Sequence, residues 1–304
     1  MYKQNKLKYF RWHWGDRYDG WRVRNVDAVF SVIPYFLRTR MDAQNYFEQR
    51  IPIDHIEAFI REHKEDIPGL SIMHVVIASM IRLVSQRPYL NRFIMWNKIF
   101  ARNYINFSIV IKRSLSDEGE ETLIKPYFQP TDTLQDVSRK ILEEQNKNQK
   151  AGQQNSSDLI SKILGYLPDW LMRVVVFTLL WLDKVGLLPR FIEQASPWHC
   201  SLFLTNIGSI GVESIYHHLY EFGNCSIFLA MGKKSQRHTV NKAGDVKGYK
   251  SILLKYVMDE RICDGWYYAS SMRMLDRILM NPSVLLTPPE KVVVDDGVRW
   301  KRVD

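Results

Sequence analysis

The sequence is 304 residues long and 46% hydrophobic, which is enough to bury one substantial core and excludes wholesale disorder. We expect one large domain over residues 1–304, or two intimate halves. The formal net charge of +9 favours polyanionic partners such as a nucleotide cofactor, a nucleic acid or an acidic membrane surface. No zinc-finger, RNA-binding or helix-turn-helix pattern is present, so a nucleic-acid partner is not expected.

The cysteines and the start of the chain indicate the compartment. Cys200, Cys225 and Cys263 are odd in number and widely spaced, which is typical neither of a zinc site nor of a disulfide framework. We expect no metal, a reduced compartment and cysteines that serve as small core residues. The N-terminal segment is basic and aromatic, without the apolar run of a secretory signal, so the sequence predicts a cytoplasmic protein.

Three helices are predicted in the first half of the chain. Apolar residues at helical spacing predict helices over 54–64 and 71–86, both packed against a sheet. Thr131 or Thr133 is expected to cap a third helix, which runs through Leu142.

Strands and a connection are predicted between and after these helices. Segment 99–113 is rich in Ile, Phe, Tyr and Val, and it is followed by an acidic turn at 116–121 and a return strand at 122–128. The polar stretch 145–157 is expected to be a mobile connection.

The segment 158–192 is the most apolar part of the chain and predicts a helical insertion. Its run Val174–Leu182 is too short to span a bilayer, and Arg173 and Lys184 flank it closely. Two interpretations remain: a helix buried in the core or in a subunit interface, which we favour, or a helix lying on a membrane surface.

The second half predicts three short strands and a closing helix. Apolar β-type runs at 200–204, 225–231 and 251–258 precede a helical pattern over 265–279 and a C-terminal tail over 281–304. The glycines between residues 208 and 211 form a turn, because a phosphate-binding loop requires a different spacing.

Three segments of this half carry a family resemblance. Asp259–Gly265 (DERICDG) resembles the D-H-R-x-x-D-G signature of the chloramphenicol acetyltransferase and dihydrolipoyl acyltransferase superfamily. Phe203–Gly211 resembles the strand-and-turn motif of that family, and Ala230–Gly232 resembles the strand that follows it. The order and spacing match over residues 196–275.

The resemblance implies an α+β fold with a mixed β-sheet flanked by helices, of the chloramphenicol acetyltransferase type. It also implies homotrimers with active sites between subunits, and acyl transfer from a thioester donor, most simply acyl-coenzyme A. The chain shows no lipoyl domain, subunit-binding domain or alanine-proline linker, so we expect a free-standing enzyme that acts on a small acceptor.

The resemblance also implies roles for individual residues. The hydroxyl of Thr205 would stabilise the oxyanion, because fixed donors matter most where charge develops. Asp264 would anchor the site through a charged partner. Arg261, Gly265 and Asn206 would give structural support, with the glycine allowing a tight entry into the closing helix.

The chain departs from the signature at the catalytic base, because Glu260 stands where the family has its histidine. An ordinary Glu has a pKa of about 4.3 against about 8.5 for a thiol, so this carboxylate needs burial in an apolar pocket to act as a base. If Glu260 is only a surface or salt-bridging residue, the chain is a catalytically inactive, oligomeric binding or scaffold protein.

His199, His217 and His218 are the other histidines that the sequence offers as substitutes. On a straight strand His199 would lie roughly 20 Å from Thr205, so cooperation within one chain is not expected. Two interpretations of His199 remain: it could contribute to a site across a subunit interface, or it could be a hydrogen-bonded structural histidine. We prefer the second.

Overall fold

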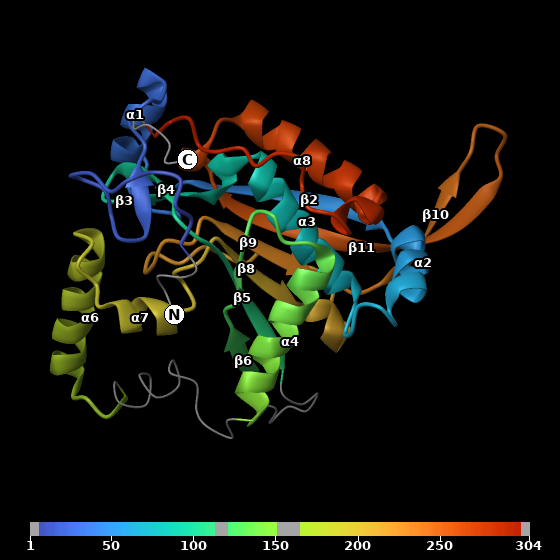
Figure 1. Ribbon diagram of the computed structural model, residues 1–304, viewed down its shortest axis with the longest axis horizontal. Coiled ribbons are helices and arrows are strands. Elements are labelled where there is room, and N and C mark those ends of the chain that lie inside the picture. Colours follow the sequence, from blue (N-terminus) through green and yellow to red (C-terminus); the bar gives the residue numbers. More distant parts are fainter. Residues whose placement is uncertain (1–5, 113–120, 151–164, 299–304) are drawn as a thin grey trace.

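The computed structural model describes residues 6–112, 121–150 and 165–298, whose elements build around one eight-stranded mixed sheet (Figure 1). The strand order is β10-β11-β9-β8-β5-β6, with β2 paired to β11 and β7 to β5. β8 runs parallel to both β5 and β9, and the other pairs are antiparallel. The strands are β2 (Gln44–Pro52), β5 (Ile105–Lys112), β6 (Glu121–Ile124), β7 (Tyr127–Phe128), β8 (Leu202–Asn206), β9 (Ile227–Met231), β10 (Ser235–Val240) and β11 (Val246–Asp259).

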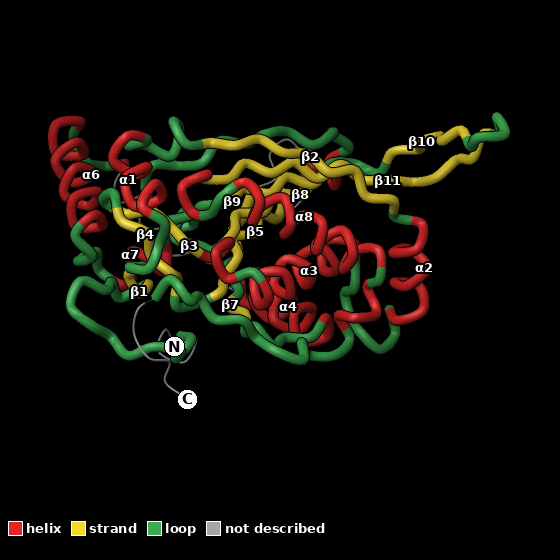
Figure 2. Tube along the Cα trace, turned by 90° about the horizontal axis from the view of Figure 1, so that it is seen from above, coloured by secondary structure: helices red, strands yellow, loops and turns green. Residues whose placement is uncertain are grey.

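Four helices cover one face of this sheet (Figure 2): α2 (Asp54–His63), α3 (Ile72–Gln86), α4 (Leu134–Lys150) and α8 (Gly265–Met280). Alternation along the strands turns Leu204, Leu229 and Leu254 toward these helices. α3 is buried nearly all round because it packs against α4, α8 and the sheet. The main core lies in this layer.

The opposite face of the sheet carries a smaller cluster. Phe203, Phe228 and Val257 pack there with Cys200 and Cys225. The rings of Phe203 and Phe228 stack with centroids 4.7 Å apart. All three cysteines are buried and free, as expected of small core residues.

Other elements occupy the two ends of the molecule (Figure 1). At one end lie a three-stranded sheet of order β1-β4-β3 and three further helices. At the other end the outer part of the β10–β11 hairpin projects away from the body. The elements of the first end are β1 (Gly20–Arg22), β3 (Arg92–Met95), β4 (Lys98–Arg102), α1 (Ala28–Phe36), α6 (Asp169–Lys184) and α7 (Arg190–Ala195).

The predicted fold class is confirmed, since a mixed sheet is flanked by helices as expected. The helices expected over 54–64, 71–86 and 265–279 are present as α2, α3 and α8. The third predicted helix is capped by Thr133, whose Oγ1 accepts a hydrogen bond from the Asp136 backbone N–H at 3.3 Å.

Two predicted strands are divided in the structure. The strand over 99–113 is wrong as a single element, because β4 pairs in the small sheet and β5 in the large one. The return strand at 122–128 is split into β6 and β7 around Pro126, which has no N–H to donate to a ladder. The acidic turn lies almost entirely in residues 113–120, outside the described residues.

One expectation for the middle of the chain was wrong in part, and for the apolar helix only burial in the core is excluded, so a subunit interface stays a prediction. Residues 145–150, expected to be a mobile connection, continue α4, while 151–157 lie outside the described residues. The apolar helix α6 is not in the core of this chain, because Asp183 is its single buried residue. None of the helices in the described residues is long and apolar enough to cross a bilayer.

The segment 281–304 begins as a packed structure rather than a loose tail. A short 3₁₀ helix over Pro282–Leu285 follows α8, and Leu285 is buried. Farther along, Asp295 forms a buried ion pair with Arg92 at 2.7 Å. The part described to residue 298 is therefore held to the body.

Candidate functional site

A buried ion pair fixes the junction between β11 and α8. The two carboxylate oxygens of Asp259 each accept a hydrogen bond from Arg261, from Nε and from Nη2, both at 2.7 Å. Arg261 Nη1 also donates to the Leu37 carbonyl oxygen at 2.8 Å. The two paired side chains are 2% and 0% exposed, so the backbone on both sides of Glu260 is held rigidly.

Glu260 itself points outward between these two buried residues. Its side chain is exposed, and Oε2 accepts a hydrogen bond from Asn45 Nδ2 at 3.1 Å. Its backbone N–H donates to the Ala43 carbonyl oxygen at 2.9 Å. The carboxylate lines a cavity of about 270 Å³ whose walls include Phe30 and Tyr268. A single chain therefore leaves the carboxylate in contact with water at the edge of a partly apolar cavity.

Asp264 and Gly265 line the same cavity, but their structural roles differ from those expected. Asp264 is exposed and caps α8, accepting a hydrogen bond from the Tyr267 N–H at 2.8 Å. Within residues 6–112, 121–150 and 165–298 Asp264 has no ion-pair partner, so the expected charged anchor is not formed. Of the two aspartates in the segment 259–265, Asp259 is the one that pairs with an arginine. A Cβ on Gly265 would meet no atom within 4 Å, so a tight helix entry does not require glycine there.

Thr205 lies at the opposite end of the sheet from Glu260. The register pairs Thr205 with Ala230 and Ala230 with Lys255, four residues before Asp259. Four residues along a strand span about 13 Å and two strand spacings about 10 Å, which places the Thr205 and Asp259 backbones roughly 16 Å apart. The two predicted catalytic side chains therefore do not meet within one chain.

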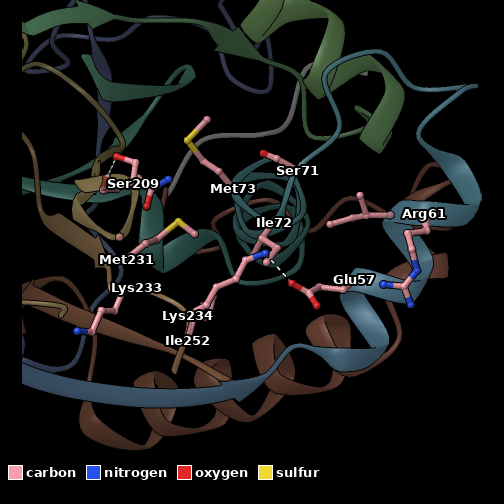
Figure 3. A pocket seen from close by; sticks show the side chains of 14 residues that line it. Glu57, Arg61, Ser71, Ile72, Met73, Ser209, Met231, Lys233, Lys234 and Ile252 are labelled. Atoms are coloured by element: carbon pink, nitrogen blue, oxygen red, sulfur yellow. Dashed lines mark hydrogen bonds and ion pairs between the residues drawn. The ribbon is translucent and has the colours of Figure 1, made fainter. Parts of the chain in front are cut away.

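A second cavity, of about 470 Å³, lies beside the end of β8 (Figure 3). Alternation directs Asn206 toward the helical face, where it lines this cavity, and directs Thr205 toward the other face with Phe203. Gly208 is required here, because a Cβ would lie 2.4 Å from the Gly232 carbonyl oxygen. This close approach holds the turn after β8 against the end of β9.

The lining of the second cavity carries several cations. Lys234, which lines the cavity, and Lys250, which does not, both form ion pairs with Glu57, and the hydrogen bond from Lys234 lowers the pKa of that carboxyl. Figure 3 shows Lys234 reaching toward Glu57, with Ser209 and Met231 on the other side of the cavity. Lys233 and Arg61 add further positive charge to the lining.

His199 is buried and holds together parts of the protein that are distant in sequence. Its Nδ1 lies 2.8 Å from Ser196 Oγ and its Nε2 lies 3.1 Å from Asp183 Oδ2. Burial lowers the pKa of His199. With a fully buried ring and both nitrogens engaged, His199 is a structural histidine in this chain. His217 stacks on Phe228 at 4.1 Å.

Sequence reasoning missed the residues that hold Glu260 and those that charge the second cavity. Asn45 lies on β2, which was not predicted, and 215 residues separate it from Glu260. Lys233 and Lys234 carried a usable signal, since they directly follow the predicted strand that ends at Gly232. In the described part of the chain, no group of His, Cys, Asp and Glu side chains could hold a metal ion.

The mixed sheet, its helical layer and the motifs at its two ends define a fold of the chloramphenicol acetyltransferase and dihydrolipoyl acyltransferase type. Comparison with known proteins agrees: residues 199–287 match the model of the 2-oxoacid dehydrogenase acyltransferase catalytic domain. No curated protein sequence matches the chain.

Two solved structures share the fold at low sequence identity, and a third is less similar. A probable dihydrolipoamide acetyltransferase from Listeria monocytogenes is 13% identical with a TM-score of 0.53, and the match covers 84% of this chain and 92% of that one. The cubic core of a pyruvate dehydrogenase multienzyme complex is 12% identical with a TM-score of 0.53, covering 85% and 89%. A chloramphenicol acetyltransferase is 11% identical with a TM-score of 0.46, covering 81% and 92%. The predicted resemblance and fold are confirmed.

Proposed function

We propose that the protein is an acyltransferase that moves an acyl group from a thioester, most simply acyl-coenzyme A, to a small acceptor. Its active site would form between copies of the chain, as in a homotrimer. One copy would supply Glu260 and the next would supply Thr205. The alternative, an inactive scaffold with the same fold, predicts no acyl transfer by the wild-type chain or by either variant.

The observation that carries this proposal is the separation of the two motif residues. Thr205 and Glu260 lie at opposite ends of the sheet, and the strand register places the backbones of Thr205 and Asp259, the residue before Glu260, roughly 16 Å apart. Acyl transfer needs a base and an oxyanion donor within about 3 Å of the reacting atoms. Two copies that meet end to end would bring the residues together, and the exposure of Glu260 leaves it accessible to a second copy.

Assembly would also change the environment of Glu260. Covering its partly apolar cavity with a second copy would remove water from the carboxylate and raise its pKa toward that of a usable base. The ion pair between Asp259 and Arg261 would keep the backbone in place during this change, since both side chains are already buried.

In the proposed reaction Glu260 takes the proton from the acceptor nucleophile as that atom attacks the thioester carbonyl carbon. The carbonyl oxygen becomes an oxyanion that accepts a hydrogen bond from the Thr205 hydroxyl. Collapse of the tetrahedral intermediate breaks the carbon–sulfur bond, and the leaving thiolate receives the proton back from Glu260. Lys233 and Arg61 in the second cavity suit the anionic groups of a coenzyme A donor.

Hybrid assemblies test the shared site directly. Thr205→Ala and Glu260→Gln chains would each be inactive alone, and their co-expression would restore activity with acyl-coenzyme A. In randomly mixed assemblies with equal amounts, about a quarter of the interfaces hold one intact Glu260 and one intact Thr205. Recovery near that fraction supports a shared site. A wild-type chain that transfers no acyl group would favour the scaffold, and full activity of the Glu260→Gln chain would exclude Glu260 as the base. Two inactive variants that never complement would contradict a site between copies.

A further inference from the structure

The helix α6 exposes an aromatic and apolar face that no part of the described chain covers. Trp170, Val174, Phe177 and Trp181 recur every three or four residues, so they share one face of the helix. Their exposed fractions are 68%, 54%, 71% and 52%. Large side chains exposed together on one element indicate an interaction surface rather than the scattered exposure that is normal for single residues.

Two cations border this face. Arg173 lies three residues after Trp170 and Lys184 lies three residues after Trp181, so each cation is a neighbour of a tryptophan on the helix surface. Both cations are exposed. Tryptophan suits the boundary between acyl chains and headgroups, and adjacent cations favour anionic headgroups.

The surface continues beyond the end of the helix. Leu187, in the connection after α6, and Phe191, on α7, are 66% and 67% exposed. Beside them lies a cavity of about 620 Å³, lined by Leu187 and by Trp12 and Trp14 of the N-terminal segment. The two tryptophans are 63% and 90% exposed.

The same cavity concentrates positive charge. Lys6 and Arg190 both line it. Burial and then the neighbouring Arg190 charge lower the pKa of Lys6. Arg17 and Asp16 also line the cavity, so its walls carry more cations than anions, which favours an anionic headgroup beside the tryptophans.

A rigid tether holds α6 in this position. Asp183, near its C-terminal end, is buried and accepts a hydrogen bond from Arg17 Nη2 at 3.1 Å. The other Asp183 oxygen lies 3.1 Å from His199 Nε2, and Arg17 is also paired to Asp19 at 2.8 Å. The helix is therefore fixed to the body at one end, while the described residues leave its aromatic face exposed.

We propose that α6, together with the cavity at its C-terminal end, binds the surface of an anionic lipid bilayer with the helix lying in the plane of the membrane. The buried contacts of Asp183 with Arg17 and His199 would then hold the rest of the protein at the membrane surface. This proposal does not depend on the proposed acyl transfer.

Co-sedimentation with vesicles at low salt tests this inference. The wild-type chain is expected to sediment with vesicles of phosphatidylglycerol and phosphatidylcholine, and much less with phosphatidylcholine alone. Trp170→Glu combined with Phe177→Glu should lower the bound fraction at least about tenfold, because two inserted aromatic groups are replaced by anions. Arg173→Gln with Lys184→Gln should remove the preference for anionic vesicles.

A matched control makes the same change in charge at the other end of the molecule. Val240→Glu with Val246→Glu replaces two side chains that are 64% and 66% exposed on the projecting hairpin, and binding should be unchanged. Thermal unfolding should stay near that of the wild type for the Trp170 and Phe177 changes and should be only slightly lower for the hairpin pair, because Val240 and Val246 are cross-strand partners whose two glutamates would repel. Absent wild-type binding at low salt, or equal loss in the control, overturns the proposal. An oligomer that forms without lipid and dissociates when Trp170 and Phe177 are replaced would also overturn the proposal, because the aromatic face would then bind a second copy of the chain.

Discussion

Replacing Arg261 with Met should destabilise the chain strongly, because Asp259 would lose its buried counter-ion. Asp259 accepts three hydrogen bonds from Arg261: two from the guanidinium at 2.7 Å and one from the backbone N–H at 3.1 Å. Its side chain is 0% exposed, so water cannot replace the lost donors. Removing one partner of a buried ion pair typically costs about 3–5 kcal/mol.

The double replacement separates the charge from the packing. Asp259→Asn with Arg261→Met removes both charges, so the free energy of unfolding should be higher than in the Arg261→Met chain, although it should stay below that of the wild type. Non-additivity between the two sites should exceed about 1 kcal/mol, as is usual for groups in one ion-pair network.

Urea unfolding at neutral pH measures these differences, since midpoints shift with stability when the slope is unchanged. A loss below about 1 kcal/mol for Arg261→Met would refute the reasoning, because that is the range of exposed ion pairs. If the losses in unfolding free energy of the two single variants add up to that of the double variant, the stability of buried Asp259 does not depend on Arg261. Arg40 would then be the first residue to examine, because its positive charge also interacts with Asp259.

Two further changes test the electrostatics and the helix cap. Burial raises the pKa of Glu193 to about 7 from an ordinary 4.5, so its contribution to stability is complete below pH 4.5 and is lost as the pH rises through 7. Glu193→Gln should therefore gain stability relative to wild type between pH 5 and pH 8, by up to about 3 kcal/mol in urea unfolding; a constant difference would contradict the shift. Asp264→Ala removes the α8 cap and should cost about 1 kcal/mol, whereas Asp264→Asn should cost less; equal losses would rule out the cap as the main role.

Local patterns were sufficient for much of the fold. α2, α3 and α8 were predicted because their apolar residues recur at helical spacing over ten residues or more. The motif strands β8 and β9 were recognised from apolar runs bounded by glycine. β2 was missed because most of its residues are polar and part of it is exposed at the sheet edge.

The candidate site was predictable as residue types but not as geometry. The motifs identified Glu260 and Thr205, yet no local pattern states that antiparallel β11 and parallel β8 place them at opposite ends of the sheet. Asn45 reaches Glu260 only because β2 pairs with β11, which depends on pairing across about 200 residues of chain.

The amino-acid sequence by itself determined the helices with clear periodicity, the motif strands and the departure from the family signature at position 260. Only the tertiary structure decided that the aromatic helix α6 is exposed and that His199 is sealed in a buried network. The physical reason is that periodicity reports which side chains share a face, whereas burial depends on which distant segment covers that face.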